Sequence, residues 1–285
     1  MNIGVIGLGS VGLFVASQLS ESHNVTGYCR RDRQRQSILK NGILVDQKPF
    51  HIDVELVENI KKHDLLIICV KQPHIDNLLP VLKEVSETTT FLFLQNGLGH
   101  IEKVSVELKN ILVGTCDYGI SKLEDHSISL KGAGLIRIAS VADNNDIAIR
   151  TANQLSRDVI NVEFASNLSQ VLHEKLIVNS VINPLTALFE VKNGEILTND
   201  YLKDIAHQLS HEAALAMKID SNHAWSLVQK VASQTKENHS SMLKDIQQNK
   251  QTEIDYINGF ILKQSQETLP SHSLIYQLIK AKENI

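Results

Sequence analysis

The sequence predicts an α/β fold in its N-terminal part and an all-α fold in its C-terminal part. Two observations carry this prediction. A glycine-rich turn lies near the N-terminus, between an apolar, strand-like run and a helix-like run. Strand-like and helix-like segments then alternate up to about Ala165, after which strand signals nearly vanish. A sheet layered with helices, followed by a bundle of helices, is the architecture that such a change of pattern indicates.

The glycine-rich turn is the most specific element of the N-terminal part. Residues 2–7 (NIGVIG) read as a short buried strand, residues 7–12 (GLGSVG) match GxGxxG, and residues 13–19 continue as a helix. In this context the first glycine makes a tight turn, the second admits a pyrophosphate and the third permits close helix packing. A second predicted strand at 23–29 completes the start of a Rossmann-type domain. We therefore expect the diphosphate of a dinucleotide at the helix N-terminus, against Gly7, Leu8, Gly9, Ser10, Val11 and Gly12.

The residues after the second predicted strand indicate which dinucleotide binds. Enzymes that use NAD commonly place an acidic side chain there against the ribose 2′-hydroxyl, whereas this chain has Arg30 and Arg31. Because arginine binds phosphate through a charged fork of N–H groups, the pair favours NADP(H). Asp32 would serve an NAD ribose only if the strand ran two residues longer. Lys71 follows the apolar run at 65–70, where a doubly wound sheet binds ligands, and would add a second cation.

The other predicted elements follow from apolar runs and their spacing. Residues 43–45 and 50–56 alternate like a small hairpin inserted after the second strand. Further strands are predicted at 65–70, 90–94, 111–115, 128–130 and 135–139, and helices at 75–85 and 101–108. The C-terminal part has the helical period, with helices predicted at 168–188, 201–217, 224–236, 253–265 and 274–282. We place the dinucleotide-binding domain at 1–165 and the helical substrate domain at 166–285, with the ligand cleft between them.

Composition narrows the class of protein. The chain has 285 residues, a net charge of −4 and a sequence pI near 6.3, so it lacks the basic surface of a nucleic-acid-binding protein. No apolar run has the length that crosses a bilayer and the N-terminus has no secretion signal, so we expect a cytoplasmic protein with no membrane partner. Cys29, Cys69 and Cys116 are widely spaced among apolar neighbours, which favours buried, reduced thiols. His207 and His211 have the spacing of a metal pair, but no third ligand accompanies them, and we expect no metal.

A polar stripe inside an apolar helix is the main candidate for chemistry. Lys175, Asn179 and Asn183 recur at every fourth position of HEKLIVNSVINPLTALF, so on a helix they lie along one face. Their neighbours are almost all apolar, so the polar groups need partners, which a ligand in a cleft would supply. The alternative is the wet edge of a surface helix. Pro184 biases Asn183 away from helical geometry and predicts a kink or a helix end there.

This stripe suits the reduction of a ketone. A hydride that arrives at a carbonyl carbon leaves negative charge on the oxygen, so the site needs a cation or a proton donor within hydrogen-bond reach. Lys175 serves both needs, and Asn179 and Asn183 would hold polar substrate groups without adding a charge. Histidine is the proton donor in many dehydrogenases, but His173 lies about 200° from Lys175 around the helix, so the two cannot share a face.

Four motifs, in order along nearly the whole chain, resemble the ketopantoate reductases, also called 2-dehydropantoate 2-reductases. They are GLGSVG at 7–12, QNGLG at 95–99, KLIVNSVINPLT at 175–186 and TEIDYING at 252–259. The resemblance implies NADPH-dependent reduction of 2-dehydropantoate to pantoate, in pantothenate and coenzyme A biosynthesis. It agrees with Lys175 as the proton donor and with Asn179 and Asn183 as residues that bind the substrate.

The same resemblance assigns roles to further residues. Asn96 looks like the residue at the nicotinamide ribose and the reacting carbonyl, although a plain turn explains most Asn-Gly pairs. Asn193 resembles a substrate-binding residue and carries the same ambiguity. Ser241 resembles the serine that binds the substrate carboxylate, with Ser240 as the alternative register and a helix cap as the alternative role. Glu253 resembles the carboxylate that contacts the cofactor and orients the lysine, and it equally suits the first turn of a helix.

Other functions on the same fold remain open from the sequence. One is a reductase of another 2-oxo acid, and a second is a β-hydroxyacid dehydrogenase, which shares the lysine and asparagine spacing. A third is a non-catalytic NADP(H) sensor, which has no need of the lysine stripe together with the distant Glu253. Exposed helices in the second domain make a homodimer a further expectation.

Overall fold

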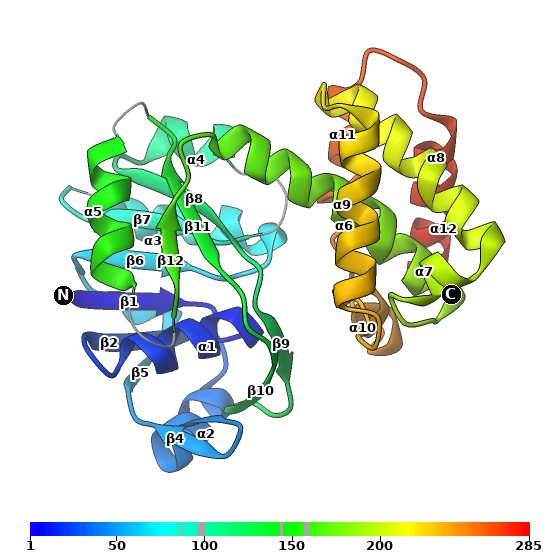
Figure 1. The fold of residues 1–285 in the computed structure, drawn as a ribbon. Coiled ribbons are helices and arrows are strands. Elements are labelled where there is room, and N and C mark those ends of the chain that lie inside the picture. Colours follow the sequence, from blue (N-terminus) through cyan, green and yellow to red (C-terminus); the bar gives the residue numbers. More distant parts are fainter. Residues whose placement is uncertain (86, 96–100, 143–144, 157–159) are drawn as a thin grey trace. The chain divides into compact units, whose positions relative to one another are not determined.

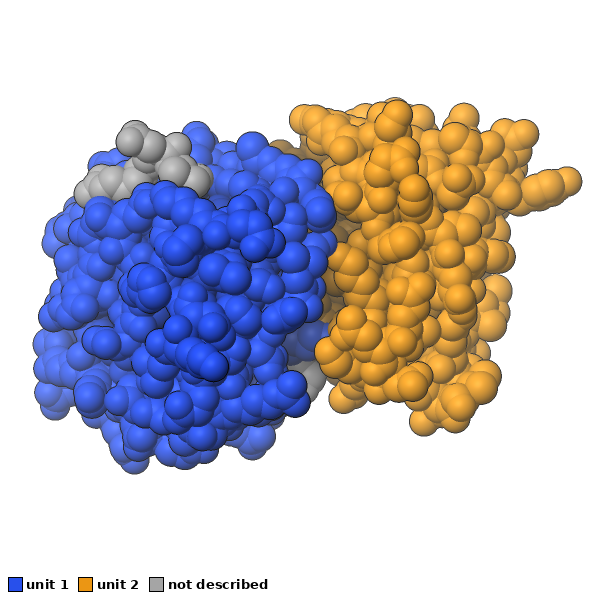
Figure 2. Space-filling view, turned by 90° about the horizontal axis from the view of Figure 1, so that it is seen from below, with its two compact units in different colours: residues 1–95, 100–168 blue, residues 96–99, 169–285 orange. Residues whose placement is uncertain are grey.

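The computed structural model describes residues 1–285 apart from 86, 96–100, 143–144 and 157–159. The chain divides into two compact units, which Figure 2 colours separately. The first comprises Met1–Gln95 and His100–Leu168, and the second comprises Asn96–Gly99 and Ser169–Ile285. Each unit buries its own cluster of apolar side chains.

Eight strands of the described chain form one sheet in the first unit (Figure 1). Their bounds are β1 Asn2–Ile6, β2 Asn24–Cys29, β5 Asp53–Leu56, β6 Leu65–Ile68, β7 Thr90–Phe93, β8 Ile111–Cys116, β11 Ile136–Ser140 and β12 Val162–Phe164. They lie in the order β12, β11, β8, β7, β6, β1, β2, β5, and the pairs are parallel except for β8 with β11. The predicted N-terminal α/β fold is therefore confirmed.

Helices and short 3₁₀ turns connect these strands. Their bounds are α1 Ser10–Leu19, α2 Asp32–Asn41, η1 Val57–Asn59, η2 Gln72–His74, α3 Ile75–Glu84, α4 Ile101–Glu107 and α5 Asn145–Leu155. All of β1 except Asn2 is buried, which explains its unbroken apolar sequence. The sequence analysis missed α2, because this helix is strongly polar and buries only Gln34 and Ile38, too few positions for a clear period.

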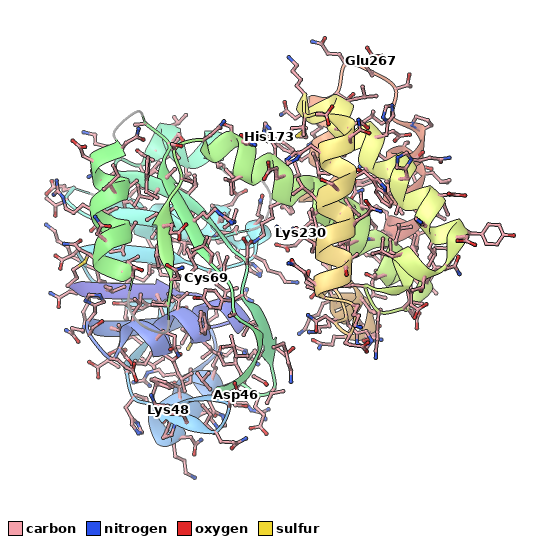
Figure 3. The ribbon with its side chains drawn as sticks, in the orientation of Figure 1. Asp46, Lys48, Cys69, His173, Lys230 and Glu267 are labelled. Carbon is pink, nitrogen blue, oxygen red and sulfur yellow. The ribbon has the colours of Figure 1, made fainter. Side chains whose placement is uncertain are left out.

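A smaller sheet corrects the predicted hairpin. Its strands, in order, are β4 Lys48–Phe50, β3 Ile43–Val45, β10 Ser127–Gly132 and β9 Gly119–Lys122. The hairpin partner of β3 is β4 rather than the predicted run at 50–56, because Asp46 and Gln47 adopt positive φ values of 46° and 73° and reverse the chain in two residues. Figure 3 labels Asp46 at this turn, where its carboxylate accepts a hydrogen bond from Ser129 Oγ of β10 (2.8 Å). Most of the predicted run instead forms β5, at the edge of the large sheet beside β2.

The second unit is helical. Its elements are α6 Leu168–Phe189, α7 Glu195–Thr198, α8 Asp200–Met217, α9 Ser221–Gln234, α10 Ser241–Gln247, η3 Ile254–Tyr256, α11 Asn258–Gln264 and α12 Pro270–Glu283. Residues 169–285 are all described and contain no strand, so the all-α prediction is confirmed. The predicted helix at 253–265 is wrong in its first part, because Ile257 (φ −104°, ψ −84°) leaves helical geometry between η3 and α11. Within the described residues, none of the helices has the length and apolar content that spanning a bilayer requires.

Pro184 lies inside α6 without ending it, so of the two outcomes predicted at Asn183, a kink or a helix end, the helix end is wrong. Proline lacks the N–H that would donate to the carbonyl four residues earlier, which here belongs to Ser180. The Ser180 carbonyl accepts a hydrogen bond from Asn258 Nδ2 instead, at 3.0 Å. With that carbonyl satisfied and its apolar face buried, α6 continues to Phe189.

A buried polar network fastens α12 to α8. Glu212 of α8 accepts hydrogen bonds from the backbone amides of Ser271 (2.9 Å) and His272 (2.8 Å), in the first turn of α12. The His272 ring is fully buried, with Nδ1 at 3.2 Å from the Glu212 carboxylate and Nε2 at 3.4 Å from Ser180 Oγ of α6. Burial by itself raises the pKa of Glu212, but the hydrogen bonds from the His272 ring and the two backbone amides outweigh it and lower the pKa to about 2.

We expect this network to make the protein sensitive to acid. A carboxyl whose pKa is lower in the folded chain stabilises the fold fully above its unfolded pKa, and that stabilisation is lost as the pH falls through the folded pKa. The free energy of unfolding should therefore fall from about pH 4.5 down to about pH 2. Denaturant titrations at a series of pH values measure it. Glu212→Gln cannot titrate and should flatten this dependence, whereas an unchanged slope would show that Glu212 is not its source.

Candidate active site

The glycine turn between β1 and α1 has the backbone that its sequence predicts. Gly7 has a φ of +93°, in the region that favours glycine, and its amide donates to Tyr28 O of β2 (2.9 Å). A Cβ on Gly12 would lie 2.0 Å from Gly7 O, so only glycine allows α1 to pack this closely. A Cβ on Gly9 would meet no atom within 4 Å. The turn therefore has open space at Gly9, where a diphosphate would lie.

The N-terminus of α1 offers backbone amides to an anion. The first helical hydrogen bond runs from Leu13 N to Gly9 O (3.0 Å), so the amides of Ser10, Val11 and Gly12 precede it. The first turn of α1 contains no acidic side chain. Amide groups at a helix N-terminus, together with the positive end of the helix dipole, stabilise bound phosphate.

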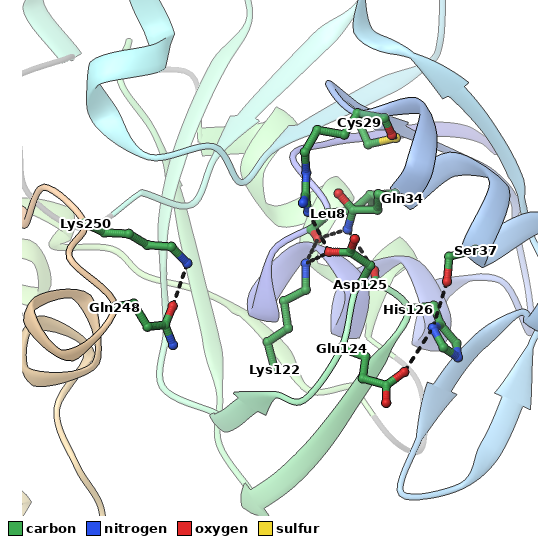
Figure 4. Close-up of polar contacts among 11 residues, drawn as sticks. Leu8, Cys29, Gln34, Ser37, Lys122, Glu124, Asp125, His126, Gln248 and Lys250 are labelled. Carbon is green, nitrogen blue, oxygen red and sulfur yellow. Dashed lines mark hydrogen bonds and ion pairs between the residues drawn. The ribbon is translucent and has the colours of Figure 1, made fainter.

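Two side chains hold the Leu8 carbonyl within the glycine turn (Figure 4). Gln34 Nε2 of α2 donates to Leu8 O at 2.7 Å, and Lys122 Nζ of β9 donates to it at 3.3 Å. Gln34 Nε2 also donates to Asp125 O (2.9 Å), and Lys122 Nζ lies 3.6 Å from the Asp125 carboxylate. The chain between β9 and β10 is thereby tied to the turn. Since a carbonyl held from two sides fixes its peptide plane, Gln34 and Lys122 support the glycine turn.

Arg30 and Lys71 both lie near His74. Arg30 Nη1 is 3.4 Å from His74 Nδ1. Burial lowers the pKa of His74, and the charges of Arg30 and Lys71 lower it further, so both cations act on one imidazole. Arg30 follows β2 and Lys71 follows β6, the two parallel neighbours of β1. Cations from both strands thus gather at the carboxyl edge of the sheet, beside the glycine turn.

Arg31 has a different environment. Its Nη2 donates to Asp125 Oδ1 at 2.5 Å. Burial raises the pKa of Asp125, but the hydrogen bond and charge of Arg31, together with Lys122, lower it below its ordinary value. The side chains of the two adjacent arginines therefore have different partners. Arg31 binds the same loop that supports the glycine turn, whereas Arg30 lies near His74.

Asp32 does not replace the arginines at the end of β2. Asp32 would follow the strand directly only if β2 were two residues longer, but β2 ends at Cys29. Asp32 instead opens α2 and accepts a hydrogen bond from Arg35 Nη1 at 3.2 Å. An acid in the first turn of a helix is favourable there, so Asp32 has a structural role.

The polar stripe lies on α6, as predicted. Lys175 and Asn179 are partly exposed, and Asn183 is buried with 7% of its surface accessible. Between them, Leu176, Ile177, Val178, Val181 and Ile182 are all buried. The stripe therefore runs from a partly accessible lysine to an enclosed amide along an otherwise apolar helix.

The structure distinguishes Ser240 from Ser241. Ser240 Oγ caps α10 by accepting from Leu243 N (3.1 Å), and it also accepts from Thr186 Oγ1 of α6 (2.7 Å). Ser240 is buried and Ser241 is exposed. Thr186 follows Asn183 by one helical turn, so its bond to Ser240 brings the start of α10 to the enclosed end of the stripe. The cap belongs to Ser240, which leaves the Ser241 hydroxyl for a ligand.

Asn193 is largely committed to the protein. Its backbone amide donates to Asn238 O (3.0 Å) and its Nδ2 donates to Thr235 Oγ1 (2.9 Å). The remaining atom, Oδ1, is buried and has no hydrogen-bond partner among the described residues. Asn193 therefore fastens the segment between α9 and α10, and only its carbonyl oxygen is left for a ligand.

Glu253 directly precedes η3, with 9% of its surface exposed. Asn258 of the same motif donates to Ser180 O, so this motif packs against α6 beside Asn179. Asn96 lies outside the described residues. Within the part of the chain that is described, no group of three or more His, Cys, Asp or Glu side chains is arranged to hold a metal ion.

The sequence analysis did not single out His74, Gln34, Lys122 or Asn258. The first three meet the cofactor residues through contacts between distant segments, for which no local pattern exists. A signal for Asn258 did exist. Pro184 inside an apolar helical run requires another donor for the Ser180 carbonyl, and the TEIDYING motif contains an asparagine that supplies it.

Comparison with known proteins gives a consistent result. Residues 3–143 match the family described as ketopantoate reductase PanE/ApbA, and residues 167–283 match ketopantoate reductase PanE/ApbA C terminal. A 2-dehydropantoate 2-reductase of Bacillus subtilis is 36% identical over 275 residues, covering 93% of this chain and 91% of the relative. A 2-dehydropantoate 2-reductase of Pyrococcus horikoshii is 31% identical, covering 100% of this chain and 98% of the relative.

Solved structures share the fold. A probable 2-dehydropantoate 2-reductase from Bacillus subtilis has a TM-score of 0.85 at 35% identity and covers 99% of this chain and 100% of its own. D-mandelate dehydrogenase with NADH and anilino(oxo)acetate has a TM-score of 0.94 at 22% identity, covering 100% and 99%. A dimeric ketopantoate reductase from Staphylococcus aureus has a TM-score of 0.84 at 22% identity, with the same coverage. At 22% identity the last two establish the fold alone.

Proposed function

This chain belongs to the ketopantoate reductase family, and on that premise we propose that it reduces 2-dehydropantoate to pantoate with NADPH, in pantothenate and coenzyme A biosynthesis. It is an oxidoreductase with NADP(H) as its cofactor. The observation that carries the proposal is the stripe of Lys175, Asn179 and Asn183 on α6. The stripe supplies one cation and two neutral amides, which suits a substrate with a ketone, a hydroxyl and a carboxylate.

The roles of the catalytic residues follow from the charge that develops during reduction. NADPH, when bound, supplies a hydride to the keto carbon. The carbonyl oxygen then takes the electron pair of the π bond and needs a proton. Lys175 polarises the carbonyl, donates that proton and stabilises the negative charge before the transfer. Glu253 would orient the lysine and contact the cofactor, and the role expected of Asn96 from the family resemblance, at the nicotinamide ribose and the carbonyl, belongs to the same proposal.

The cofactor is held through its two anionic groups. Amides of residues 7–12 would hold the diphosphate at the N-terminus of α1. Arg30 and Lys71 would hold the 2′-phosphate, since both cations lie near His74 beside the glycine turn. Arg31 contributes less to the 2′-phosphate, since Asp125 engages its guanidinium.

Substrate contacts provide a prediction that separates two adjacent serines. Asn183→Ala and Ser241→Ala should each raise the KM for 2-dehydropantoate roughly tenfold, because a hydrogen bond to a charged group contributes about 1.5 kcal/mol or more. Steady-state kinetics and NADPH titration measure the two effects, and NADPH affinity should stay near wild type. Ser240→Ala is the matched control, and it should lower the free energy of unfolding by about 1 kcal/mol through loss of the α10 cap. Loss of NADPH binding in the folded Asn183 or Ser241 variants would contradict these roles.

One assay tests the proposed function against the other functions. The purified protein is supplied with NADPH and a panel of 2-oxo acids, and oxidation of NADPH is followed by absorbance. We expect the highest kcat/KM for 2-dehydropantoate. Preference for another 2-oxo acid, or oxidation of 3-hydroxy acids as the main activity, would favour the other enzyme functions. NADPH binding without turnover of any compound would favour a sensor.

Three further properties belong to the same proposal. We propose a homodimer, in line with the dimeric relative from Staphylococcus aureus, to be tested by sedimentation velocity. A cytoplasmic location suits an enzyme whose substrate is a small 2-oxo acid and whose cofactor is NADPH. Residues 1–165 and 166–285 are proposed as the cofactor and substrate domains, and limited proteolysis between them would test that division.

A further inference from the structure

Pro184 creates a specific gap in the backbone of α6. In an uninterrupted helix, the amide of residue 184 would donate to Ser180 O, but proline has no N–H and its ring pushes that carbonyl away. Proline is also the least favourable residue in a helix interior. The carbonyl that loses its helical donor belongs to Ser180, which follows Lys175 and Asn179 and precedes Asn183 along the helix.

Asn258 fills this gap from another element. Its Nδ2 donates to Ser180 O at 3.0 Å, and the residue is fully buried at the start of α11. A carbonyl acceptor fixes the orientation of the amide, because only its NH₂ group can donate. Asn258 Oδ1 is then buried with no hydrogen-bond partner among the described residues. A buried unpaired oxygen is unfavourable, so Asn258 is not the residue that stability alone would select.

Pro184 and Asn258 are thus a complementary pair: proline removes a donor to Ser180 O, and asparagine supplies another. Without Pro184, the Ser180 carbonyl would have its helical partner and an apolar residue would suit the site of Asn258 better. Without Asn258, the Ser180 carbonyl would lose the side-chain donor that takes the place of the missing amide of residue 184. The pair therefore fixes one conformation of α6 between Asn179, which is partly exposed, and Asn183, which is buried.

We propose that Asn258 is a positioning residue for the substrate site, which replaces the hydrogen bond that Pro184 removes and so sets Asn183 relative to Lys175 and Asn179. The inference rests on the proposed function for the part that concerns substrate. The proposed role requires no contact between Asn258 and the substrate or the cofactor. Asn258 acts through the backbone of Ser180, and TEIDYING accordingly has a second role besides the one proposed for Glu253.

The test is a double-mutant cycle of wild type, Asn258→Ala, Pro184→Ala and the double variant. Pro184→Ala restores the helical donor to Ser180 O, so the loss of Asn258 should matter only where Pro184 is present. We expect Asn258→Ala to lower kcat/KM for 2-dehydropantoate by about tenfold or more with the NADPH affinity unchanged, as for a lost buried hydrogen bond. Adding Asn258→Ala to Pro184→Ala should change kcat/KM by less than about twofold.

Three further measurements keep the test decisive. Asn258→Leu removes the donor but keeps the number and branching of the side-chain heavy atoms, so it leaves no cavity; it should behave like Asn258→Ala, which separates the hydrogen bond from a cavity effect. Asn284→Ala is the matched control, because Asn284 Nδ2 also donates to a helix carbonyl, Lys280 O at 2.7 Å, but at an exposed helix end. It should leave kcat/KM unchanged. Denaturant unfolding of all variants measures the same coupling without any substrate.

The outcomes are distinct. Coupling between positions 184 and 258 in both unfolding and kcat/KM supports the proposal. Additive effects, in which Asn258→Ala costs as much in the Pro184→Ala background as in the wild-type background, overturn it. Coupling in unfolding without any in kcat/KM leaves a structural pair and overturns the positioning role. If wild type fails to turn over 2-dehydropantoate, the proposed function fails, and the unfolding cycle still decides whether Asn258 replaces the bond that Pro184 removes.

Discussion

Lys175→Ala is expected to lower the turnover number with 2-dehydropantoate by about 10²- to 10⁴-fold, while NADPH still binds. Removal of a positioned general acid has this effect on the rate, which corresponds to roughly 2.7 to 5.4 kcal/mol of barrier. In the role proposed for Lys175, alanine removes both the proton donor and the cation that stabilises the developing negative charge. Single-turnover kinetics at neutral pH measure the chemical step directly, and fluorescence titration measures NADPH affinity.

Two variants serve as controls for this result. Lys175→Arg keeps the charge but should not restore turnover, because a guanidinium gives up its proton far less readily than an ammonium. His173→Ala alters the same helix two residues away, on another face, and should keep turnover near wild type. If Lys175→Ala retained a tenth or more of wild-type turnover with chemistry limiting the rate, the proton donor would be another residue.

Arg30→Ala is expected to weaken NADPH binding by about 10- to 150-fold, because a charged hydrogen-bonding partner contributes roughly 1.5 to 3 kcal/mol. NADH lacks the 2′-phosphate, so its affinity should barely change. Titration of the variant with both cofactors measures the ratio. Equal weakening of the two cofactors would show that Arg30 supports the fold rather than the phosphate, and a wild-type preference for NADH would contradict the cofactor assignment.

Arg31→Ala is the matched control for Arg30. The two arginines are adjacent, but Arg31 donates to Asp125 (2.5 Å) whereas Arg30 lies with Lys71 near His74. We therefore expect Arg31→Ala to weaken NADPH binding less than Arg30→Ala does. A larger effect at Arg31 would reverse the roles of the two residues.

The sequence predicted those parts of the molecule that depend on local pattern. The glycine turn and the helix that carries the stripe have short-range signals, and both are present where they were expected. The pairing of β3 with β4 was missed because a two-residue turn of Asp46 and Gln47 at positive φ lacks the glycine that usually marks it. The roles assigned to individual site residues stay predictions.

Long-range contacts account for the remaining differences. The Ser180 carbonyl that Pro184 leaves without its helical donor accepts a hydrogen bond from Asn258, 78 residues away, and a rule about the residue before proline does not contain that contact. The different environments of Arg30 and Arg31 likewise involve a distant residue, because the partner of Arg31 is Asp125, 94 residues away. A single sequence contains no local pattern that identifies Asn258 or Asp125 as the partner of such a distant residue.

The two side chains that donate to the Leu8 carbonyl are synthesised at different times. Gln34 leaves the ribosome soon after the turn, but Lys122 is separated from Leu8 by 114 residues and Asp125 from Gln34 by 91. Domains fold as their residues emerge during synthesis, and contacts between distant segments form late. A nascent chain that stops before Lys122 therefore contains GxGxxG but lacks one of the two side-chain donors to the Leu8 carbonyl.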